Sequence, residues 1–102
     1  MNSIITNNLD KIQSLCRQYR VKELYAFGSV IDERKFNDKS DVDLLVEFRE
    51  VPLMEYADNY FDLLFSLQNL LKRDVDLVTV KSLKNPVFIR VVNRTRIPVY
   101  SA

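Results

Sequence analysis

The chain has 102 residues, of which 47% are hydrophobic, so its size and composition predict one globular domain, residues 1–102. A net charge of +1 gives no indication of direct nucleic-acid binding. The absence of histidine and the single cysteine exclude Ser-His-Asp catalysis, histidine-ligated zinc and an internal disulfide. We expect a cytoplasmic protein, because no apolar run could span a bilayer and the N-terminus shows no secretory signal.

The first half of the chain predicts a helix and two strands. Residues 3–19 carry apolar side chains three and four residues apart, which is typical of an amphipathic helix, and Cys16 lies on its apolar side as a small core residue. A short buried strand over 23–28 ends in glycine. The polar loop 31–40 then leads into a second strand over 41–48.

The second half predicts two more helices and two more strands. Pro52 interrupts the chain before the first of them. In order, we expect a long helix over 54–72, a strand over 75–80, a helix over 85–93 and a strand over 96–100. This order predicts an α/β (α+β) fold, with a single mixed sheet of about four strands flanked by helices.

Two aspartates share one face of the second strand. Side chains alternate along a strand, so Asp41 and Asp43 point the same way, about 7 Å apart, while Val42 and Leu44 point to the opposite face. Two neighbouring carboxylates repel each other unless a cation lies between them. Hard oxygen ligands of this kind suit Mg²⁺, which indicates metal-dependent phosphoryl or nucleotidyl transfer.

A Gly-Ser pair precedes the aspartates, and a further acidic strand follows them. Gly28, the only glycine in the chain, could form a small phosphate-binding turn to which the Ser29 hydroxyl adds a donor. Asp76 lies in an apolar strand and could complete a three-carboxylate cluster for two Mg²⁺ ions, if its strand neighbours the second strand. Asp74 shares its face and is a rival candidate, although it lies closer to a turn.

An ordinary solvated sheet face is the alternative interpretation of this acidic strand. Asp41, Asp43 and Glu47 would then simply point into water, but Leu45 interrupts that polar face. Aspartate is also a poor strand former, so its repeated use is unexplained by solvation. The combination of the Gly-Ser pair, Asp41, Asp43 and Asp76 favours the catalytic interpretation.

The chain resembles a minimal nucleotidyltransferase of the DNA polymerase β-like superfamily. The resemblance rests on Phe27-Gly28-Ser29, on Asp41-Val42-Asp43 after eleven intervening residues, and on the segment 75–78. It extends over nearly the whole chain. It implies that Gly28 and Ser29 bind the triphosphate of ATP. It also implies that Asp41, Asp43 and Asp76 are the catalytic and Mg²⁺-binding residues.

The loop after the Gly-Ser pair departs from the family pattern. Many relatives have an arginine after the serine and another glycine soon afterwards, whereas this chain continues with Val30, and its loop is about one residue longer than usual. Arg34, Lys35 or Lys39 could compensate by reaching a phosphate. An ordinary surface-loop role is the alternative for each of the three.

The long helix carries more apolar side chains than one sheet face requires. Beside its main apolar face, Met54, Phe61 and Phe65 form a second stripe at helical spacing. Two explanations stay open: a protein interface with an exposed stripe, or a wide buried face. A homo-oligomer is also left open.

The resemblance also implies a function and a partner. Small transferases of this kind act as the antitoxin of HEPN/MNT (MntA-type) toxin–antitoxin pairs and transfer AMP to a tyrosine of a HEPN-type helical partner. Two alternatives remain: an antitoxin that only masks its partner, and an aminoglycoside-type transferase. The latter ranks last because such enzymes usually carry an additional domain for the drug.

Overall fold

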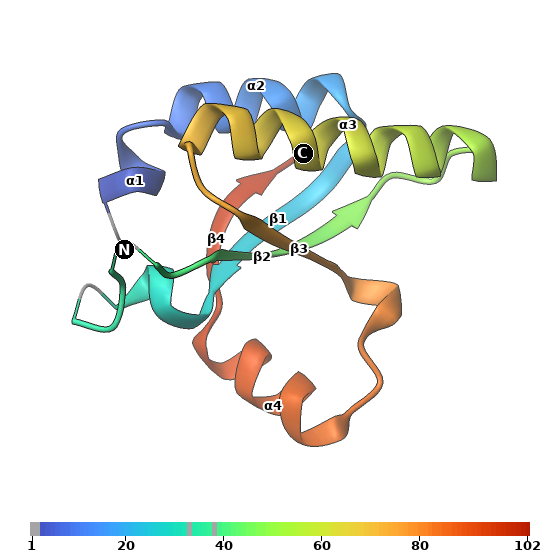
Figure 1. Ribbon diagram of the computed structural model, residues 1–102. Coiled ribbons are helices and arrows are strands. Elements are labelled where there is room, and N and C mark those ends of the chain that lie inside the picture. Colours follow the sequence, from blue (N-terminus) through green and yellow to red (C-terminus); the bar gives the residue numbers. More distant parts are fainter. Residues whose placement is uncertain (1–2, 33, 38) are drawn as a thin grey trace.

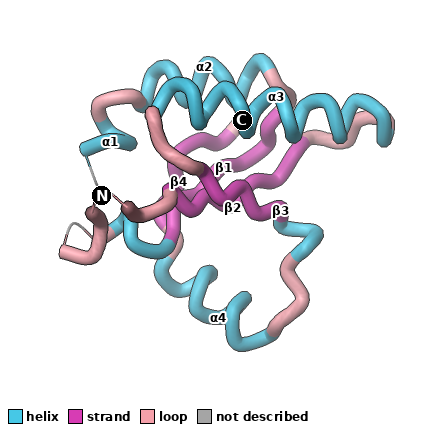
Figure 2. Tube along the Cα trace, viewed as in Figure 1, coloured by secondary structure: helices cyan, strands magenta, loops and turns pink. Residues whose placement is uncertain are grey.

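The computed structural model describes residues 3–32, 34–37 and 39–102 (Figure 1). Its helices, strands and loops follow one another as Figure 2 shows. In chain order the elements are α1 (Ser3–Thr6), α2 (Leu9–Gln18), β1 (Val21–Phe27), the 3₁₀ helix η1 (Gly28–Ile31), β2 (Val42–Phe48), α3 (Leu53–Leu71), β3 (Val75–Thr79), the 3₁₀ helix η2 (Val80–Ser82), α4 (Pro86–Thr95) and β4 (Ile97–Ser101).

The four strands form one mixed sheet in the order β3-β2-β1-β4. β1 lies antiparallel to both β2 and β4, while β2 and β3 are parallel and are joined through α3. A parallel pair needs such a crossover, because a tight hairpin would make the second strand run antiparallel to the first. The mixed sheet with flanking helices confirms the predicted fold class.

The two faces of the sheet are covered very differently. Helices α2 and α3 lie side by side over one face, whereas α4 alone lies on the other (Figure 1). The main core lies under α2 and α3 and includes Leu24, Leu44 and Leu67, each fully buried. A smaller cluster of Phe27, Leu45 and Val92 lies on the α4 face. Because strand side chains alternate, Asp43 and Asp76 also belong to the α4 face.

α3 packs along the sheet through one apolar stripe. Leu63, Leu67 and Leu71 are buried, and each contributes about 1.5–3 kcal/mol by leaving water. The helix ends at Lys72, which takes a left-handed conformation with φ of 57° and donates its backbone N–H to the Gln68 carbonyl. None of the described helices is long and apolar enough to cross a bilayer.

The second stripe of α3 is exposed rather than buried. Phe61 and Phe65 stack on each other with ring centroids 6.3 Å apart, and they are 52% and 60% exposed. Met54 is exposed as well. Of the two explanations left open by the sequence, the wide buried face is therefore wrong for these three residues.

The predicted helix over 3–19 is divided in two. α1 ends at Thr6 and α2 begins at Leu9, because the side-chain amide of Asn8 donates to the Ile4 carbonyl (2.8 Å) and competes with continued helical bonding. Cys16 is fully buried on α2, and burial raises the pKa of its thiol to about 12, as expected for an unreactive core residue. The other boundaries differ from the prediction by one or two residues.

Each outer strand of the sheet receives a hydrogen bond from a helix side chain. The Tyr60 hydroxyl of α3 donates to the Leu77 carbonyl of β3 (2.7 Å). On the other side, the Gln13 amide of α2 donates to the Val99 carbonyl of β4 (3.1 Å). β4 also contains Pro98, which has no backbone N–H to offer a neighbouring strand.

Candidate active site

Asp43 lies near one end of the sheet, on the α4 face, between residues of two neighbouring strands. In the sheet register it is paired with Phe27 of β1 and with Asp76 of β3. Adjacent strands are about 4.8 Å apart, so the carboxylates of Asp43 and Asp76 lie side by side on one face. The structure thus brings together two of the three carboxylates expected from the sequence, on strands separated by the whole of α3.

Gly28 leaves the space that the Asp43 carboxylate occupies. It follows β1 with a φ of +71°, in the left-handed region that other residues adopt at a cost. A Cβ atom on Gly28 would overlap the Asp43 carboxylate oxygen Oδ2 and would lie 3.3 Å from Cγ. Both the backbone angle and this close approach therefore require glycine, which explains why the only glycine of the chain is here.

Ser29 follows within η1 and is half-buried beside this turn. Its backbone carbonyl accepts a hydrogen bond from the Asp32 N–H (3.0 Å), which closes the 3₁₀ helix. Its hydroxyl makes no hydrogen bond to another residue in the described part of the chain. The Ser29 hydroxyl is therefore available as a donor one residue beyond the glycine that Asp43 approaches.

Asp41 and Asp76 influence the protonation of Asp43. The pKa of Asp43 is raised to about 6, first by partial burial and then by the negative charges of Asp76 and Asp41. Asp41 is exposed and lies just before β2, because the strand predicted over 41–48 begins one residue later, at Val42. The charges of Asp76 and Asp41 thus both act on the Asp43 carboxylate.

Asp74, the rival of Asp76, borders a different cavity from Asp76. Its backbone carbonyl accepts from the Val42 N–H (3.0 Å), and it lines a cavity of about 460 Å³ together with Lys39, Asp41 and Arg73. Asp76 instead borders a hollow of about 410 Å³ at the outer side of β3. The register with Asp43 favours Asp76 as the third carboxylate.

The three carboxylates offer oxygen ligands for divalent cations without yet converging on one point. Within 3–32, 34–37 and 39–102, no three acidic, cysteine or histidine side chains come close enough to hold one ion jointly. The donor chemistry nevertheless fits Mg²⁺, because a cation would relieve the repulsion that raises the pKa of Asp43. Because Gly28 has no Cβ atom, the Asp43 carboxylate fits against the backbone at that position.

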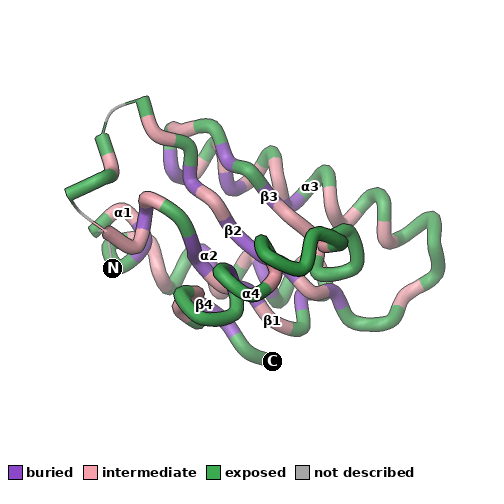
Figure 3. The backbone as a smooth tube through the Cα atoms, turned by 90° about the horizontal axis from the view of Figure 1, so that it is seen from below, coloured by how far each residue is buried: buried purple, intermediate pink, exposed green. Residues whose placement is uncertain are grey.

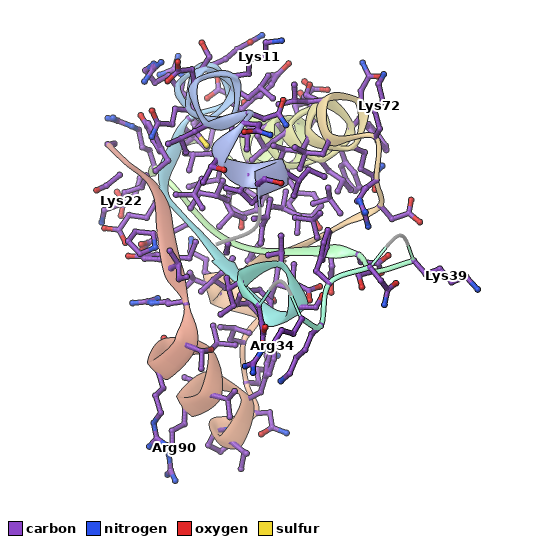
Figure 4. The ribbon with its side chains drawn as sticks, turned by 90° about the vertical axis from the view of Figure 1, so that its left-hand side faces the viewer. Lys11, Lys22, Arg34, Lys39, Lys72 and Arg90 are labelled. Carbon is purple, nitrogen blue, oxygen red and sulfur yellow. The ribbon has the colours of Figure 1, made fainter. Side chains whose placement is uncertain are left out.

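The three basic residues suggested as phosphate ligands have different surroundings. Arg34 forms an ion pair with Asp32 (3.3 Å), and its side chain is 91% exposed. Hydrogen bonds from the Arg34 backbone N–H and then from its side chain lower the pKa of the Asp32 carboxyl group. Lys35 is exposed as well. Lys39 lines the cavity beside Asp41, and Figure 4 shows its side chain extending from the loop. By position, Lys39 has the best access to a ligand bound next to Asp41.

Arg73 organises the loop before the aspartates, a role that the sequence pattern did not predict. Its guanidinium donates to the carbonyls of Asn37 (2.6 Å) and Ser40 (3.0 Å) and lies over the Phe36 ring, 4.3 Å from its centroid. These contacts fix the chain immediately before Asp41. The only signal in the sequence was a basic pair, Lys72-Arg73, at the end of a long helix.

The sequence matches the family described as Polymerase beta, Nucleotidyltransferase over residues 10–102. The chain belongs to this family. A relative from Methanocaldococcus jannaschii, which carries the provisional name of a protein adenylyltransferase, is 42% identical over 72 residues, or 71% of this chain and 69% of the relative. The predicted resemblance is confirmed, and the protein is a nucleotidyltransferase.

Solved structures of the same fold extend this similarity to nearly the whole chain. A provisionally assigned minimal nucleotidyltransferase matches with a TM-score of 0.77 and 28% identity, covering 96% of both chains. A chain from a toxin–antitoxin structure with AMP-PNP matches with a TM-score of 0.69 and 24% identity over 93% of this chain and 74% of that one. Another chain comes from a complex of a tri-AMPylated Shewanella oneidensis HEPN toxin with its MNT antitoxin, with a TM-score of 0.64 and 23% identity over 96% of this chain and 73% of that one.

Proposed function

We propose that this nucleotidyltransferase transfers AMP from ATP to a hydroxyl group of a protein and releases pyrophosphate. The observation that carries the proposal is the register of Asp43 with Asp76, with Asp41 close by and Gly28 leaving room for the Asp43 carboxylate. The name of the M. jannaschii relative supports a protein as the acceptor. We place the reaction in the cytoplasm, where ATP is available.

The proposed roles are those that the family resemblance implies for these residues, and the register of Asp43 with Asp76 supports them. Asp41 and Asp43 would hold two Mg²⁺ ions, with Asp76 as a further ligand of one of them. When bound, these ions would neutralise triphosphate charge and lower the pKa of the acceptor hydroxyl. Gly28 permits close approach of the backbone, and the Ser29 hydroxyl donates to a phosphate oxygen.

The transfer step balances without a histidine. The acceptor oxygen forms a bond to the α-phosphorus of ATP while the bond from that phosphorus to the bridging oxygen breaks, and pyrophosphate leaves. The proton of the acceptor hydroxyl passes to Asp76 or to water, since the chain offers no imidazole. Lys39 stands beside Asp41, where it can neutralise charge on the departing phosphates.

For the acceptor we propose a tyrosine of a HEPN-type helical partner. A HEPN toxin in complex with an MNT antitoxin of the same fold is described as tri-AMPylated, which makes such a protein the first acceptor to test. The exposed stripe of Met54, Phe61 and Phe65 on α3 supports a lasting contact with a partner protein. The same stripe is the observation that favours the second candidate function, in which the chain inhibits its partner by masking alone.

One experiment separates these two functions. The chain is incubated with labelled ATP, Mg²⁺ and a HEPN-type helical protein from the same genome, and the partner is examined by intact mass. We expect the partner to gain one or more AMP units with the native chain and none with the D41N/D43N double variant. Glu47→Gln is the matched control, because Glu47 lies on the same face of β2 but is paired with Glu23 at its far end.

Two results would count against transfer. A partner of unchanged mass with the native chain would contradict it, whether or not the two proteins form a complex. Full toxin inhibition by the D41N/D43N variant would indicate masking instead, since binding through α3 does not need the carboxylates.

A further inference from the structure

The charges of this chain are segregated along the sequence. All 14 acidic residues lie before residue 77, whereas residues 77–102 contain five of the 15 basic ones. These five are Lys81, Lys84, Arg90, Arg94 and Arg96. A net charge of +1 therefore conceals a strongly basic C-terminal segment, in which α4 is the central element.

Some of these basic groups are already engaged within the fold. Lys81 lies over the ring of Tyr56 (5.7 Å from its centroid), and Arg96 lies over the ring of Tyr25 (4.1 Å). Lys84, Arg90 and Arg94 are exposed and form no ion pair within the described part of the chain. Their charges are therefore available to another molecule.

α4 presents these charges beside an exposed apolar stripe. Residues four apart lie on the same side of a helix, so Val87 and Val91 form one row and Arg90 and Arg94 form the row next to it. Val87 is 68% exposed and Val91 is 53% exposed, whereas Val92 on the opposite side is buried. Figure 3 shows α4 largely exposed in the view from below. We name Val87, Arg90, Val91 and Arg94 the α4 surface.

The α4 surface belongs to the same side of the sheet as the carboxylates. Val92 packs with Phe27 and Leu45 on this face. Phe88, the neighbour of Val87, meets Phe27 edge to face with ring centroids 6.0 Å apart, and Phe27 is paired with Asp43 in the sheet register. A protein held on α4 is therefore held on the side of the sheet that carries Asp43 and Asp76.

We propose that the α4 surface binds an acidic amphipathic helix of the protein acceptor and so presents the acceptor hydroxyl to the carboxylates. This inference rests on the proposed function. The two rows fit a helix that places apolar side chains beside glutamates or aspartates at the same four-residue spacing.

The composition of the surface favours a protein over a nucleic acid. Half of its four side chains are valines, which offer neither a charge for phosphate nor a ring for base stacking. The aromatic side chain of the helix, Phe88, contacts Phe27 and is 40% exposed, less than either valine. Arginine beside exposed aliphatic groups matches the composition of protein contact surfaces.

Binding is measured first, without nucleotide, by fluorescence anisotropy on the full chain. The probe is a labelled helical peptide of about 18 residues, five turns, with leucines in one row and glutamates in the next. We expect binding that weakens about tenfold or more in R90E/R94E and in V87S/V91S. A peptide with lysines in place of the glutamates should bind R90E/R94E better than it binds the native chain.

K11E/R17E is the matched control for R90E/R94E, because it makes the same change in net charge on α2, over the opposite face of the sheet. Lys11 and Arg90 lie at opposite ends of the molecule in Figure 4. We expect K11E/R17E to bind the acidic peptide as the native chain does. Circular dichroism and thermal unfolding verify that every variant is folded, and all the substituted positions are exposed.

Three binding results would overturn the inference. The first is equal binding of the acidic peptide by R90E/R94E and the native chain. The second is tighter binding of a single-stranded RNA of about 20 nucleotides, or of vesicles containing anionic lipids, through the same arginines. The third is a dimer of this chain, seen by light scattering, that R90E/R94E dissociates, since α3 carries Asp58 and Asp62 beside its own apolar stripe.

The transfer assay then distinguishes this inference from the proposed function. If the native chain modifies its acceptor, R90E/R94E should raise the KM for the acceptor about tenfold and leave kcat within about twofold. An unchanged KM would contradict the role of α4 while leaving the transferase function intact. If no acceptor is modified at all, the transferase proposal fails, and the peptide measurements still decide whether the α4 surface binds acidic helices.

Discussion

Replacing Asp43 by asparagine should stabilise the metal-free protein at neutral pH although it removes a proposed metal ligand. Partial burial and the charges of Asp76 and Asp41 raise the pKa of Asp43 to about 6, so its ionised form carries a cost in the folded state. Asparagine has nearly the same shape and no charge. It therefore removes the cost without opening a cavity.

The magnitude and its pH dependence follow from this pKa. A shift from 3.8 to about 6 corresponds to at most about 3 kcal/mol, and solvent screening of this half-buried group reduces it to about 1–2 kcal/mol. Below the unfolded-state pKa, both states are protonated and the cost vanishes. Between the two pKa values the folded state binds more protons than the unfolded state, so stability falls as the pH rises to about 6.

Thermal unfolding in EDTA at several pH values tests this reasoning. We expect D43N to unfold about 5–10 °C above the native chain at pH 8, with this gap closing as the pH falls below 4. Saturating Mg²⁺ with an ATP analogue should stabilise only the native chain and reduce or reverse the gap. Asp58→Asn, on the exposed side of α3, is the control. An equal gain for D43N at pH 3.5 and pH 8 would refute an electrostatic cause, and so would no gain at pH 8.

Further predictions concern the turn, the loop and the core. Gly28→Ala should destabilise the protein by about 1–2 kcal/mol in urea unfolding, through its positive φ and the overlap with Asp43, and should lower AMP transfer about 100-fold. Arg73→Met should cost about 1–3 kcal/mol in the same unfolding assay, because it removes the bonds to the Asn37 and Ser40 carbonyls; unchanged stability would contradict the role given to Arg73. Cys16 should resist iodoacetamide at pH 8 until the chain unfolds, as intact mass would show, since burial raises the pKa of its thiol to about 12.

The sheet and its acidic face could be predicted because strand periodicity determines which side chains share a face. Alternation alone placed Asp41 and Asp43 together and Val42 opposite them. Adding Asp76 required one further assumption, that β3 neighbours β2. The long helix between these strands made a parallel crossover the natural connection, and the observed register pairs Asp43 with Asp76.

Features that depend on particular side-chain contacts could not be predicted. The break between α1 and α2 comes from the side chain of Asn8 turning back to the Ile4 carbonyl, and apolar spacing does not register this competition. Arg73 lies on the turn after α3 yet binds a loop 33 and 36 residues earlier in the chain. The exposure of Val87 and Val91 could not be predicted either. An amphipathic pattern shows which side chains share a face of the helix, but not how many of them the rest of the protein covers.

The hydrogen bonds from Tyr60 and Gln13 to the outermost strands limit how this protein can assemble. One backbone carbonyl of each edge strand already accepts a hydrogen bond from a helix side chain, and β4 also contains Pro98. Neither edge strand therefore pairs readily with a strand of another chain. Extension of the sheet into fibrils or strand-exchanged dimers is therefore disfavoured. A neighbouring molecule would instead have to approach through side chains of the helices.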